Sequence, residues 1–470
     1  MLVTVEEADA VAWDAAQAWS GDEEPESRAL AAAVAGAVAL EAAAGCAKTC
    51  IQILGGIGFT WEHDAHLYLR RALATRQLLG QAAPERHRVT ALALTGARRS
   101  LASDLPPEAE AVRQRLAPVV AEVAALDGAA QREAMVETGL HAPHWPRPWG
   151  RDASALEQLV ADEELSKAGV ARFHLGVGAW ALPTIIAHGT TEQQERWVRP
   201  TLLGQLSWCQ LFSEPGAGSD LASLSTRAER VPGGWRLNGQ KVWTSMAQTA
   251  DWGICLARSD PSAPKHEGIT YFVVDMRAEG LDVRPLRELT GDAMFNEVFL
   301  TDVFVPDDCV VGAPGGGWSI ARTTLANERV QMSSGSTFGT GVESVLRKVA
   351  RMGDAVDDGV VDALGELLCE AQALALMSHR ATLRSLSGTD PGAGASVRKL
   401  FGAEHEQRVQ ELGLSLYGAD GAVMDGGALR WERGFLVTRC LTIAGGTSEV
   451  QRNVMAERIL GQPRDAEPDG

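Results

Sequence analysis

Hydrophobic positions recur at helical spacing towards both ends of this chain, and shorter β-rich runs occupy its middle. Residues 4–50 are mostly Ala, Glu, Val and Leu and predict two helices, interrupted at 21–25. The glycines at 55–58 break the second helix, and residues 62–79 predict another. Residues 80–108 contain three prolines and predict a linker region.

The middle of the chain has the pattern of a β domain between helical segments. Helical spacing returns at about 107–140, 152–171 and 190–203. From Trp208 to Val311, short runs rich in β-branched and aromatic residues alternate with Gly, Pro and Asp, as in a β-barrel or β-sandwich. Long helical patterns resume from Ile320 to Leu460. The sequence therefore predicts a mainly α protein with a central β-barrel domain.

Composition narrows the class of protein. The 470 residues are 45% hydrophobic and 22% charged, which is ordinary for a globular chain with more than one domain. A net charge of −18 argues against binding to nucleic acid or to an anionic membrane surface. We find no run of about 18 apolar residues and no basic N-terminal start. We therefore expect neither a membrane span nor a signal peptide.

The cysteines and histidines predict no metal site. Seven scattered cysteines are typical of reduced, buried thiols in a cytoplasmic protein. Cys46 and Cys50 lie four apart on a predicted helix, but no second pair follows at ligand spacing. His141 and His144 are flanked by prolines and predict an ordinary loop.

Two segments of the β domain carry candidate chemistry. In segment 211–220, glycines would let backbone N–H groups approach a planar, electron-rich ring, and Ser213 and Ser219 would add hydroxyl donors. The alternative is a plain Gly/Pro turn between strands.

The second segment begins at Asn238–Gly239, which is a strong hairpin signal. Trp243 follows on a predicted strand, where an indole could cover the face of such a ring, and Ser245 adds a hydroxyl. The alternative for Trp243 is ordinary core packing.

Together with the helical–β–helical order of residues 108–463, these segments resemble the acyl-CoA dehydrogenase family. Segment 211–220 matches the family's flavin loop at ten positions, which implies that FAD is bound. By this resemblance, Ser213 bonds the pyrimidine edge, Ser219 lies nearer the acyl-CoA, and Ser245 bonds flavin N5, the hydride acceptor. The cofactor-binding residues implied in this domain are Leu211, Ser213, Gly218, Ser219, Trp243 and Ser245.

The catalytic base that the resemblance implies has an unusual position. Most family members carry a glutamate immediately before the Gly-Thr of a C-terminal motif, where this chain has Gly445. A smaller branch carries the base on an earlier helix, before an arginine, and Glu328–Arg329 fits that place. A surface ion pair is the alternative, but the missing side chain at Gly445 favours Glu328 as the base. The backbone N–H of Gly445 would polarise the thioester carbonyl, and Ser219 and Arg329 would contact the substrate.

Residues 1–80 resemble the C-terminal end of another copy of the same fold. Segment 50–59 matches the family's Gln-x-x-Gly-Gly-x-Gly element, which implies that Gln52, Gly55 and Gly56 hold the pyrophosphate of FAD. We expect the chain to be the rear part of a longer fused polypeptide that starts at an internal methionine. Fused two-copy dehydrogenases of the actinobacterial steroid side-chain type have this organisation.

The second copy departs from the family where the ADP half of FAD would bind. Residues 416–421 lack the glutamine and one glycine of the element, and residues 347–360 lack the Arg-x-x-Phe-Gly element. We therefore expect one FAD site per two-copy unit, with the first copy holding the pyrophosphate and the second the reactive ring. We also expect this chain to bind FAD weakly, because the Arg-x-x-Phe-Gly element of the first copy would precede Met1.

The predicted domain boundaries follow from the pattern of helices and strands and from the resemblance of residues 1–80 and 108–463 to the family. They are 1–80 for a C-terminal helical remnant of a first copy, 81–107 for a linker, 108–207 for an N-terminal helical domain, 208–316 for a β-barrel flavin domain, 317–463 for a C-terminal helical domain, and 464–470 for a tail.

The function that the resemblance implies is dehydrogenation of an acyl-CoA thioester to the trans-2-enoyl-CoA, by α-proton abstraction and β-hydride transfer to flavin. The implied partners are the acyl-CoA, an electron-transfer flavoprotein and other acyl-CoA dehydrogenase subunits in a homo- or hetero-oligomer. Two alternatives stay open: a catalytically silent copy that completes a neighbour's FAD site, and an acyl-CoA oxidase-like flavoenzyme.

Overall fold

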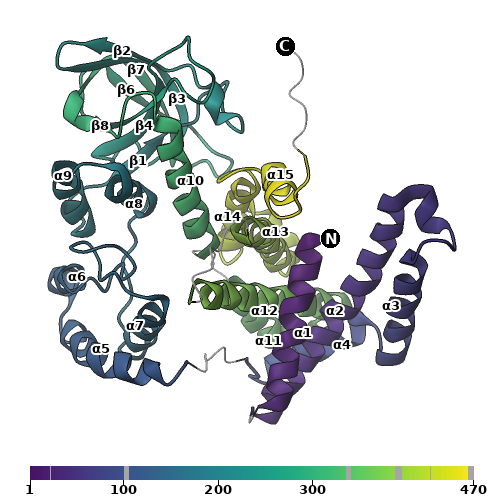
Figure 1. The fold of residues 1–470 in the computed structure, drawn as a ribbon. Helices are drawn as coiled ribbons and strands as arrows, with labels where there is room; N and C mark the ends of the chain where they lie inside the picture. Colours follow the sequence, from purple (N-terminus) through teal and green to yellow (C-terminus); the bar gives the residue numbers. More distant parts are fainter. Residues whose placement is uncertain (22, 100–104, 335–339, 387–393, 424, 464–470) are drawn as a thin grey trace. The chain divides into compact units, whose positions relative to one another are not determined.

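In the computed structural model, the chain divides into two compact units (Figure 1). All residues are described except 22, 100–104, 335–339, 387–393, 424 and 464–470. One unit comprises Met1–Ser103 and Met332–Gly470, and we call it the helical unit. The other comprises Asp104–Gln331, and we call it the mixed unit because it contains both helices and the sheet.

The first part of the helical unit is built from Ala-rich sequence. Pro25 stands at the start of its longest helix, where the missing N–H leaves no hydrogen bond unmade. Gly55 ends that helix with a φ of +64°, at the predicted break. The elements are α1 (Leu2–Ser20), α2 (Pro25–Leu54), the 3-10 turn η1 (Gly55–Phe59), α3 (Ala65–Leu79) and α4 (Ala82–Leu94).

The second part of the helical unit repeats this order of two long helices, a 3-10 turn and two shorter helices. The repeat runs from α12 to α15, with η6 as an additional turn. The elements are α11 (Thr340–Met352), η4 (Gly353–Ala355), α12 (Asp358–Leu386), α13 (Gly394–Ser415), η5 (Gly418–Ala422), α14 (Leu429–Thr438), η6 (Arg439–Thr442) and α15 (Ser448–Arg458).

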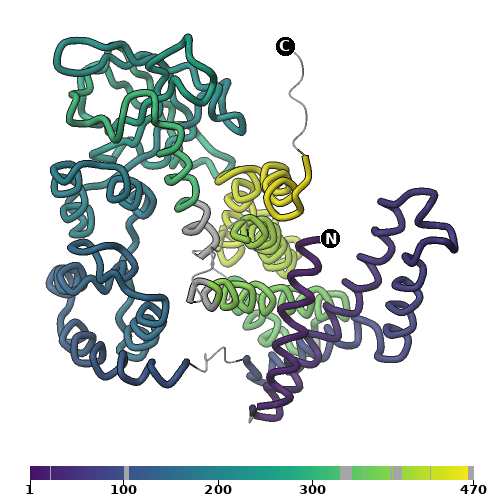
Figure 2. The backbone as a smooth tube through the Cα atoms, in the orientation of Figure 1, coloured from purple at the N-terminus to yellow at the C-terminus, as the bar shows by residue number. Residues whose placement is uncertain are grey.

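The two parts of the helical unit share one core, and Figure 2 shows their helices side by side. Arg86 of α4 donates two hydrogen bonds of 2.8 Å to Asp362 of α12 at the edge of this core. The core residues include Val11, Leu30, Val34, Val89, Leu374, Met377, Val397 and Phe401. The first copy is therefore packed into the second rather than tethered to it.

Helix α4 lies where the sequence predicted a linker over 81–107. Pro84 suggested a break, but it is the third residue of the helix. A proline in the first turn removes no intrahelical hydrogen bond, so the helix continues through it. The helix packs against α2 and α12, so residues 82–94 of the predicted linker belong to the bundle.

Among the described residues, one helix is long and apolar enough to cross a membrane by length and composition, which corrects the expectation that no such stretch exists. It spans Pro25–Phe59 with a mean hydropathy of 1.8, and 39% of the apolar window is buried. Its buried positions are mainly alanines that pack in the bundle, and a core helix passes the same test.

The mixed unit begins with helices that the sequence placed at 107–140, 152–171 and 190–203, and these are confirmed. Capping boxes at Ser154 with Glu157 and at Thr190 with Gln193 fix the starts of two of them. One helix, α8, was not predicted. The helices are α5 (Glu108–Ala124), α6 (Gly128–Glu137), α7 (Ala155–Lys167), α8 (Gly178–His188), α9 (Thr191–Leu202) and α10 (Gly317–Ser334), which belongs to this unit as far as Gln331.

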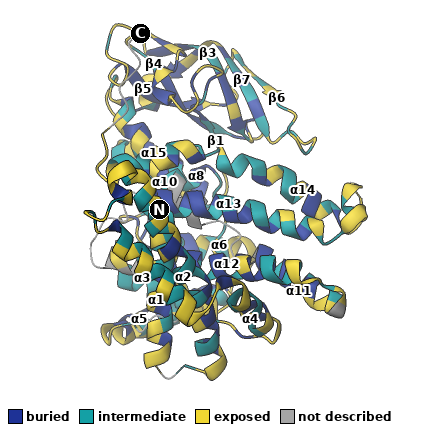
Figure 3. Cartoon of the chain, turned by 90° about the vertical axis from the view of Figure 1, so that its right-hand side faces the viewer, coloured by how far each residue is buried: buried dark blue, intermediate teal, exposed yellow. Residues whose placement is uncertain are grey.

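The β segment forms a mixed sheet with strand order β6-β7-β3-β2-β4-β5-β8, and β1 pairs in parallel with β4. The strands of the predicted barrel are confirmed, but the described pairings do not close them into one. Figure 3 shows buried positions along the strands in dark blue. The strands are β1 (Trp208–Leu211), β2 (Arg227–Val231), β3 (Gly234–Ser245), β4 (Trp252–Arg258), β5 (Ile269–Asp275), β6 (Leu281–Pro285), β7 (Phe295–Pro306) and β8 (Val310–Val311).

The hairpin predicted at Asn238–Gly239 is wrong, because both residues lie inside β3. The hairpin joins β2 to β3, whose pairing closes at Val231 and Gly234. Asn238 instead marks a register shift against β7, where its amide exchanges two hydrogen bonds with Asp302, of 2.9 and 3.0 Å. Glycine is required at 239 because an added Cβ would lie 2.4 Å from the hydroxyl oxygen of Thr226.

Candidate active site

The predicted flavin loop, residues 211–220, leaves strand β1 in a tight turn. Glu214 and Ala217 exchange two backbone hydrogen bonds of 3.0 Å, and the Ser213 carbonyl accepts one of 2.9 Å from the Val242 N–H. The loop is therefore fixed against β3. Leu211 is buried and Ser213 half-buried, whereas Gly218 and Ser219 are exposed.

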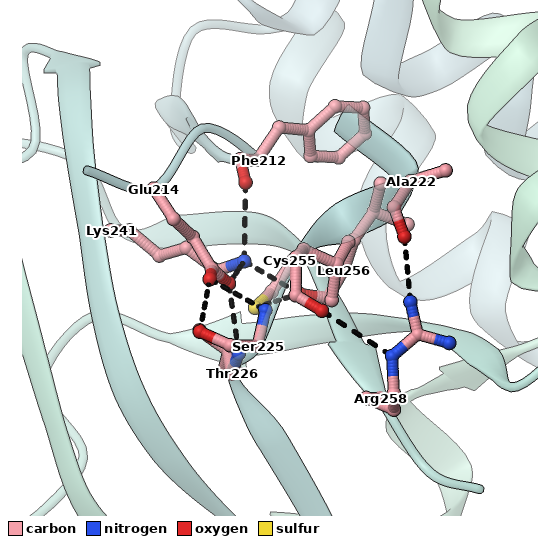
Figure 4. A network of polar contacts seen from close by, with 10 residues as sticks. Phe212, Glu214, Ala222, Ser225, Thr226, Lys241, Cys255, Leu256 and Arg258 are labelled. Carbon is pink, nitrogen blue, oxygen red and sulfur yellow. Dashed lines mark hydrogen bonds and ion pairs between the residues drawn. The ribbon is translucent and has the colours of Figure 1, made fainter. Parts of the chain in front are cut away.

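A buried ion pair lies beneath this loop (Figure 4). The Lys241 ammonium of β3 donates to Glu214 Oε1 at 2.8 Å and to the carbonyl oxygens of Phe212 and Leu256 at 3.1 and 2.8 Å. The second carboxylate oxygen of Glu214 accepts from the backbone N–H and the hydroxyl of Ser225, at 2.7 and 2.8 Å. Every polar atom of the pair is thus satisfied away from water.

The charge on Glu214 is stabilised by this environment. Burial alone would raise the pKa of the carboxyl, but Lys241 and the N–H groups of Ser225 and Thr226 outweigh it and lower the pKa to about 2. The carboxylate is therefore ionised at any pH at which the protein would work.

Trp243 is held in a conformation that few non-glycine residues adopt. Its φ is +60°, at a register shift of β3 against β7 between Lys241 and Thr244. Its side chain is 62% exposed and meets Phe295 edge-on, with ring centroids 6.3 Å apart. The core-packing alternative is therefore wrong for this indole. The bulge aims a large flat ring outward beside Ser245.

Glu328 lies on α10 within the same unit as the loop. Its Oε2 accepts a hydrogen bond of 3.2 Å from Nε2 of Gln210, the third residue of β1. Gln210 Oε1 in turn accepts one of 2.5 Å from the indole N–H of Trp180 on α8. Arg329, the predicted substrate contact, follows on α10, and its side chain lies outside the described residues.

Gly445 lies in the helical unit, in the loop before α15. It and Gly446 have φ of +66° and +90°. The side-chain amide of Gln451 donates to both their carbonyl oxygens, at 2.9 and 3.3 Å, and the Lys399 ammonium donates to that of Gly446 at 2.6 Å. The carbonyls of Gly445 and Gly446 are thereby held, which fixes the peptide planes that carry the N–H groups of Gly446 and Thr447.

The predicted pyrophosphate residues Gln52, Gly55 and Gly56 lie at the end of α2 and in η1, also in the helical unit, and all three are exposed. A Cβ added at either glycine would meet no atom within 4 Å. The equivalent turn of the second copy is η5, which begins at Gly418 and contains Asp420.

Family models match nearly the whole chain. The acyl-CoA dehydrogenase N-terminal domain matches residues 108–205, and the middle domain matches 209–303. The C-terminal domain of the family matches twice over, at 1–94 and at 315–460. The chain therefore belongs to the acyl-CoA dehydrogenase family, whose members use FAD, and a C-terminal segment of the family precedes its N-terminal domain.

Individual proteins that the chain resembles are also acyl-CoA dehydrogenases. The chain is 53% identical to acyl-CoA dehydrogenase FadE34 of Mycobacterium tuberculosis over 99% of its own length, but it spans only 64% of that relative. Its fold matches the Tcur3481-Tcur3483 steroid ACAD with a TM-score of 0.62 and 29% identity, over 77% of this chain and all of that one. It also matches the ChsE4-ChsE5 complex of Mycobacterium tuberculosis, with a TM-score of 0.61 and 30% identity, over 78% and 100%.

The residues of the mixed unit fit FAD, the cofactor of the family. Among the described residues, the hydroxyls of Ser213, Ser219 and Ser245 make no hydrogen bond to another protein atom. Trp243, two residues before Ser245 on β3, presents an exposed indole. A Cβ added at Gly218 would meet no atom within 4 Å, so its backbone is open to a ligand. These groups would hold the ring, which supplies hydride acceptance.

In the part of the chain that the structure describes, no group of three or more His, Cys, Asp or Glu could hold a metal ion. His141 instead stacks on Phe173, with ring centroids 3.7 Å apart, and burial lowers its pKa to about 3.

Sequence reasoning missed Gln210 and Trp180. The available signal was the polar Gln210 between two apolar residues of a short buried strand.

Proposed function

We propose that this chain is an FAD-dependent acyl-CoA dehydrogenase in which Glu328 is the base. The observation that supports this most directly is the hydrogen bond between Glu328 and Gln210. Gln210 immediately precedes Leu211, the first residue of the predicted flavin loop. One hydrogen bond therefore ties the carboxylate to the strand that positions the loop, whereas Gly445 has no side chain that could act as a base.

In the proposed reaction, the Glu328 carboxylate removes a proton from the α-carbon of the thioester, and the electron pair of that C–H bond forms the Cα=Cβ double bond. FAD, when bound, would supply the acceptor for the hydride that leaves the β-carbon. The product is the trans-2-enoyl-CoA, and the proton remains on the Glu328 carboxyl until it exchanges with solvent. We assign polarisation of the thioester carbonyl to the backbone N–H of Gly445.

The other predicted residues take positioning roles in this proposal. Ser213, Ser245 and Trp243 would hold the flavin ring, with Ser213 at its pyrimidine edge, Ser245 at N5 and Trp243 over one face. Ser219 and Arg329 contact the acyl-CoA. The support for Ser213, Ser245 and Trp243 is their grouping on two segments that Lys241 and Val242 hold together.

For the substrate, we propose an acyl-CoA with a bulky ring system, because the matched Tcur3481-Tcur3483 protein is a steroid ACAD. For the partners, we propose an electron-transfer flavoprotein and a homo- or hetero-oligomer, as the matched ChsE4-ChsE5 structure is a complex. We propose a cytoplasmic location, since Cys209, Cys255 and Cys309 are buried and outside disulfides.

Anaerobic titration of the FAD-loaded protein with a panel of acyl-CoAs tests the reaction. Bleaching of the flavin by steroid side-chain thioesters, and weaker bleaching by straight chains, supports both the activity and the substrate class. A flavin that binds but is bleached by no thioester contradicts the proposal. Rapid reoxidation of the reduced flavin by oxygen would instead indicate an oxidase.

The departures at 416–421 favour a second candidate, a silent copy that completes a neighbour's FAD site. The dehydrogenase and the silent copy differ in whether a thioester reduces the bound flavin, and they do not differ in the number of FAD molecules bound per chain. A silent copy leaves the bound flavin oxidised with every thioester, whereas the proposed dehydrogenase is reduced by some of them. We expect at most one FAD per chain in either case, because η5 lacks the glutamine and one glycine found around η1.

A further inference from the structure

Three side chains from three separate elements form a hydrogen-bonded series that ends at Glu328. The Trp180 indole of α8 donates to Gln210 of β1, and Gln210 donates to Glu328 of α10. We infer that Gln210, oriented by Trp180, is a positioning residue that holds the Glu328 carboxylate in its reactive place. The inference rests on the proposed function, in which Glu328 is the base.

Strand β1 makes Gln210 an unusual position. Its neighbours Cys209 and Leu211 are fully buried, and successive side chains of a strand point to opposite faces. Gln210 therefore lies on the opposite face from both, and it is half-buried. A long amide at this position can bridge from the strand to the helices, which an apolar residue could not do.

The donor and acceptor groups on either side fix the orientation of the Gln210 amide. An indole N–H can only donate, so it must meet the amide oxygen. The amide NH₂ of Gln210 is then directed to Glu328, whose carboxylate oxygen accepts. Trp180 thus selects the one amide orientation that offers the carboxylate a donor. Without Trp180, the amide could rotate and present its oxygen to a negative charge.

A second contact between the same two helices holds their register. One turn along α8 from Trp180, the hydroxyl of Thr184 lies 2.9 Å from that of Thr324. Thr324 lies one turn before Glu328 on α10, and the buried Tyr271 hydroxyl of β5 is 3.1 Å from it. The two threonines form one hydrogen-bonded connection between α8 and α10, and the series through Gln210 forms the next one along the helices. We call these connections the threonine rung and the Gln210 rung. The threonine rung fixes the helix, and the Gln210 rung fixes the carboxylate.

The two rungs allow positioning to be separated from packing. Gln210→Met keeps the length of the side chain and removes both hydrogen bonds. Trp180→Phe keeps an aromatic ring and removes only the donor that orients the amide. Thr184→Val is the matched control, because it breaks the other rung and leaves Gln210 untouched.

The first readout is the infrared carboxylate bands of Glu328, identified as those that Glu328→Gln removes. We expect these bands to shift in Gln210→Met and, by a smaller amount, in Trp180→Phe, and to stay at their wild-type frequency in Thr184→Val. The readout needs neither substrate nor flavin. Unchanged bands in both Gln210→Met and Trp180→Phe would overturn the inference.

The second readout is turnover of the FAD-loaded protein. We expect Gln210→Met to lower kcat about ten- to a hundredfold, as for loss of one hydrogen bond to a charged group, with KM within about twofold of wild type. A rise in KM at constant kcat would count against positioning. Wild-type turnover in Glu328→Gln would refute the proposed function instead, and the infrared result would still report on the hydrogen bond.

Discussion

The ammonium of Lys241 and the carboxylate of Glu214 lie 2.8 Å apart, with 0% and 4% of their side chains exposed. The same ammonium donates to the carbonyls of Phe212 and Leu256, so its three N–H groups are all used. One lysine of β3 therefore holds both the residue before Ser213 and the residue after it. The shape of the predicted flavin loop depends on a charge that water does not reach.

Removing this lysine should unfold the loop and lower the free energy of unfolding of the protein. Lys241→Met leaves the Glu214 carboxylate buried without its partner, which costs about 3–5 kcal/mol. Urea denaturation measures this loss, and FAD affinity should fall with it. As a control, Arg284→Met removes an exposed pair with Asp282 and should cost less than about 1 kcal/mol. Equal stability of the two variants would contradict the importance of the buried pair.

Glu7 of α1 should make the helical unit less stable at alkaline pH. Burial, followed by the nearby charge of Glu370, raises its pKa from 4.5 to about 7, although Arg408 opposes this. Since the folded pKa lies above the unfolded value, the cost of ionising Glu7 appears as pH rises from 4.5 and is complete above pH 7.

Glu7→Gln removes this cost without changing the size of the side chain. We expect it to stabilise the protein by about 1–2 kcal/mol at pH 8 and to change little at pH 4, allowing for partial exposure of the site. Thermal unfolding at both pH values measures the difference. Glu26→Gln on the exposed start of α2 is the control for the loss of a surface carboxyl group. An equal effect of Glu7→Gln at both pH values would exclude its titration as the cause.

The Trp243 side chain should lower the stability of the protein and strengthen its binding of FAD. A non-glycine residue at a φ of +60° carries strain of about 1 kcal/mol. Trp243→Gly relieves the strain, whereas Trp243→Ala retains it, so the glycine variant should be the more stable of the two by about that amount. Both should bind FAD more weakly than wild type. FAD binding at wild-type affinity in both variants would remove the indole from the site.

The sequence was sufficient to predict an element where the local residue pattern alone determines the structure. The repeated helical patterns at both ends and the glycines at 55–58 led to the correct helices and to the correct family. The Gly-rich loop before Ser219 and the strand position of Trp243 were also predictable, because glycine permits a tight turn and Trp243 lies in a run of strand-forming residues. The outward direction of its indole was not predictable, because it depends on the bulge in β3.

The errors arose where tertiary contacts override a local signal. Asn238–Gly239 has the composition of a hairpin, but Asp302 captures the Asn238 side chain within a strand. Pro84 has the character of a breaker, but it stands in the first turn of α4. The link from Trp180 through Gln210 to Glu328 joins positions 30 and 118 apart in sequence, and no local pattern records such a contact.

The assignment of the base is tested most directly by the rate of anaerobic flavin bleaching in Glu328→Gln, with an acyl-CoA that reduces the wild-type protein. The variant keeps the size of the side chain and can still accept from Gln210, so FAD should bind as in wild type. If Glu328 removes the α-proton, bleaching should slow by about 10²–10⁴-fold. Bleaching at the wild-type rate would show that another group is the base.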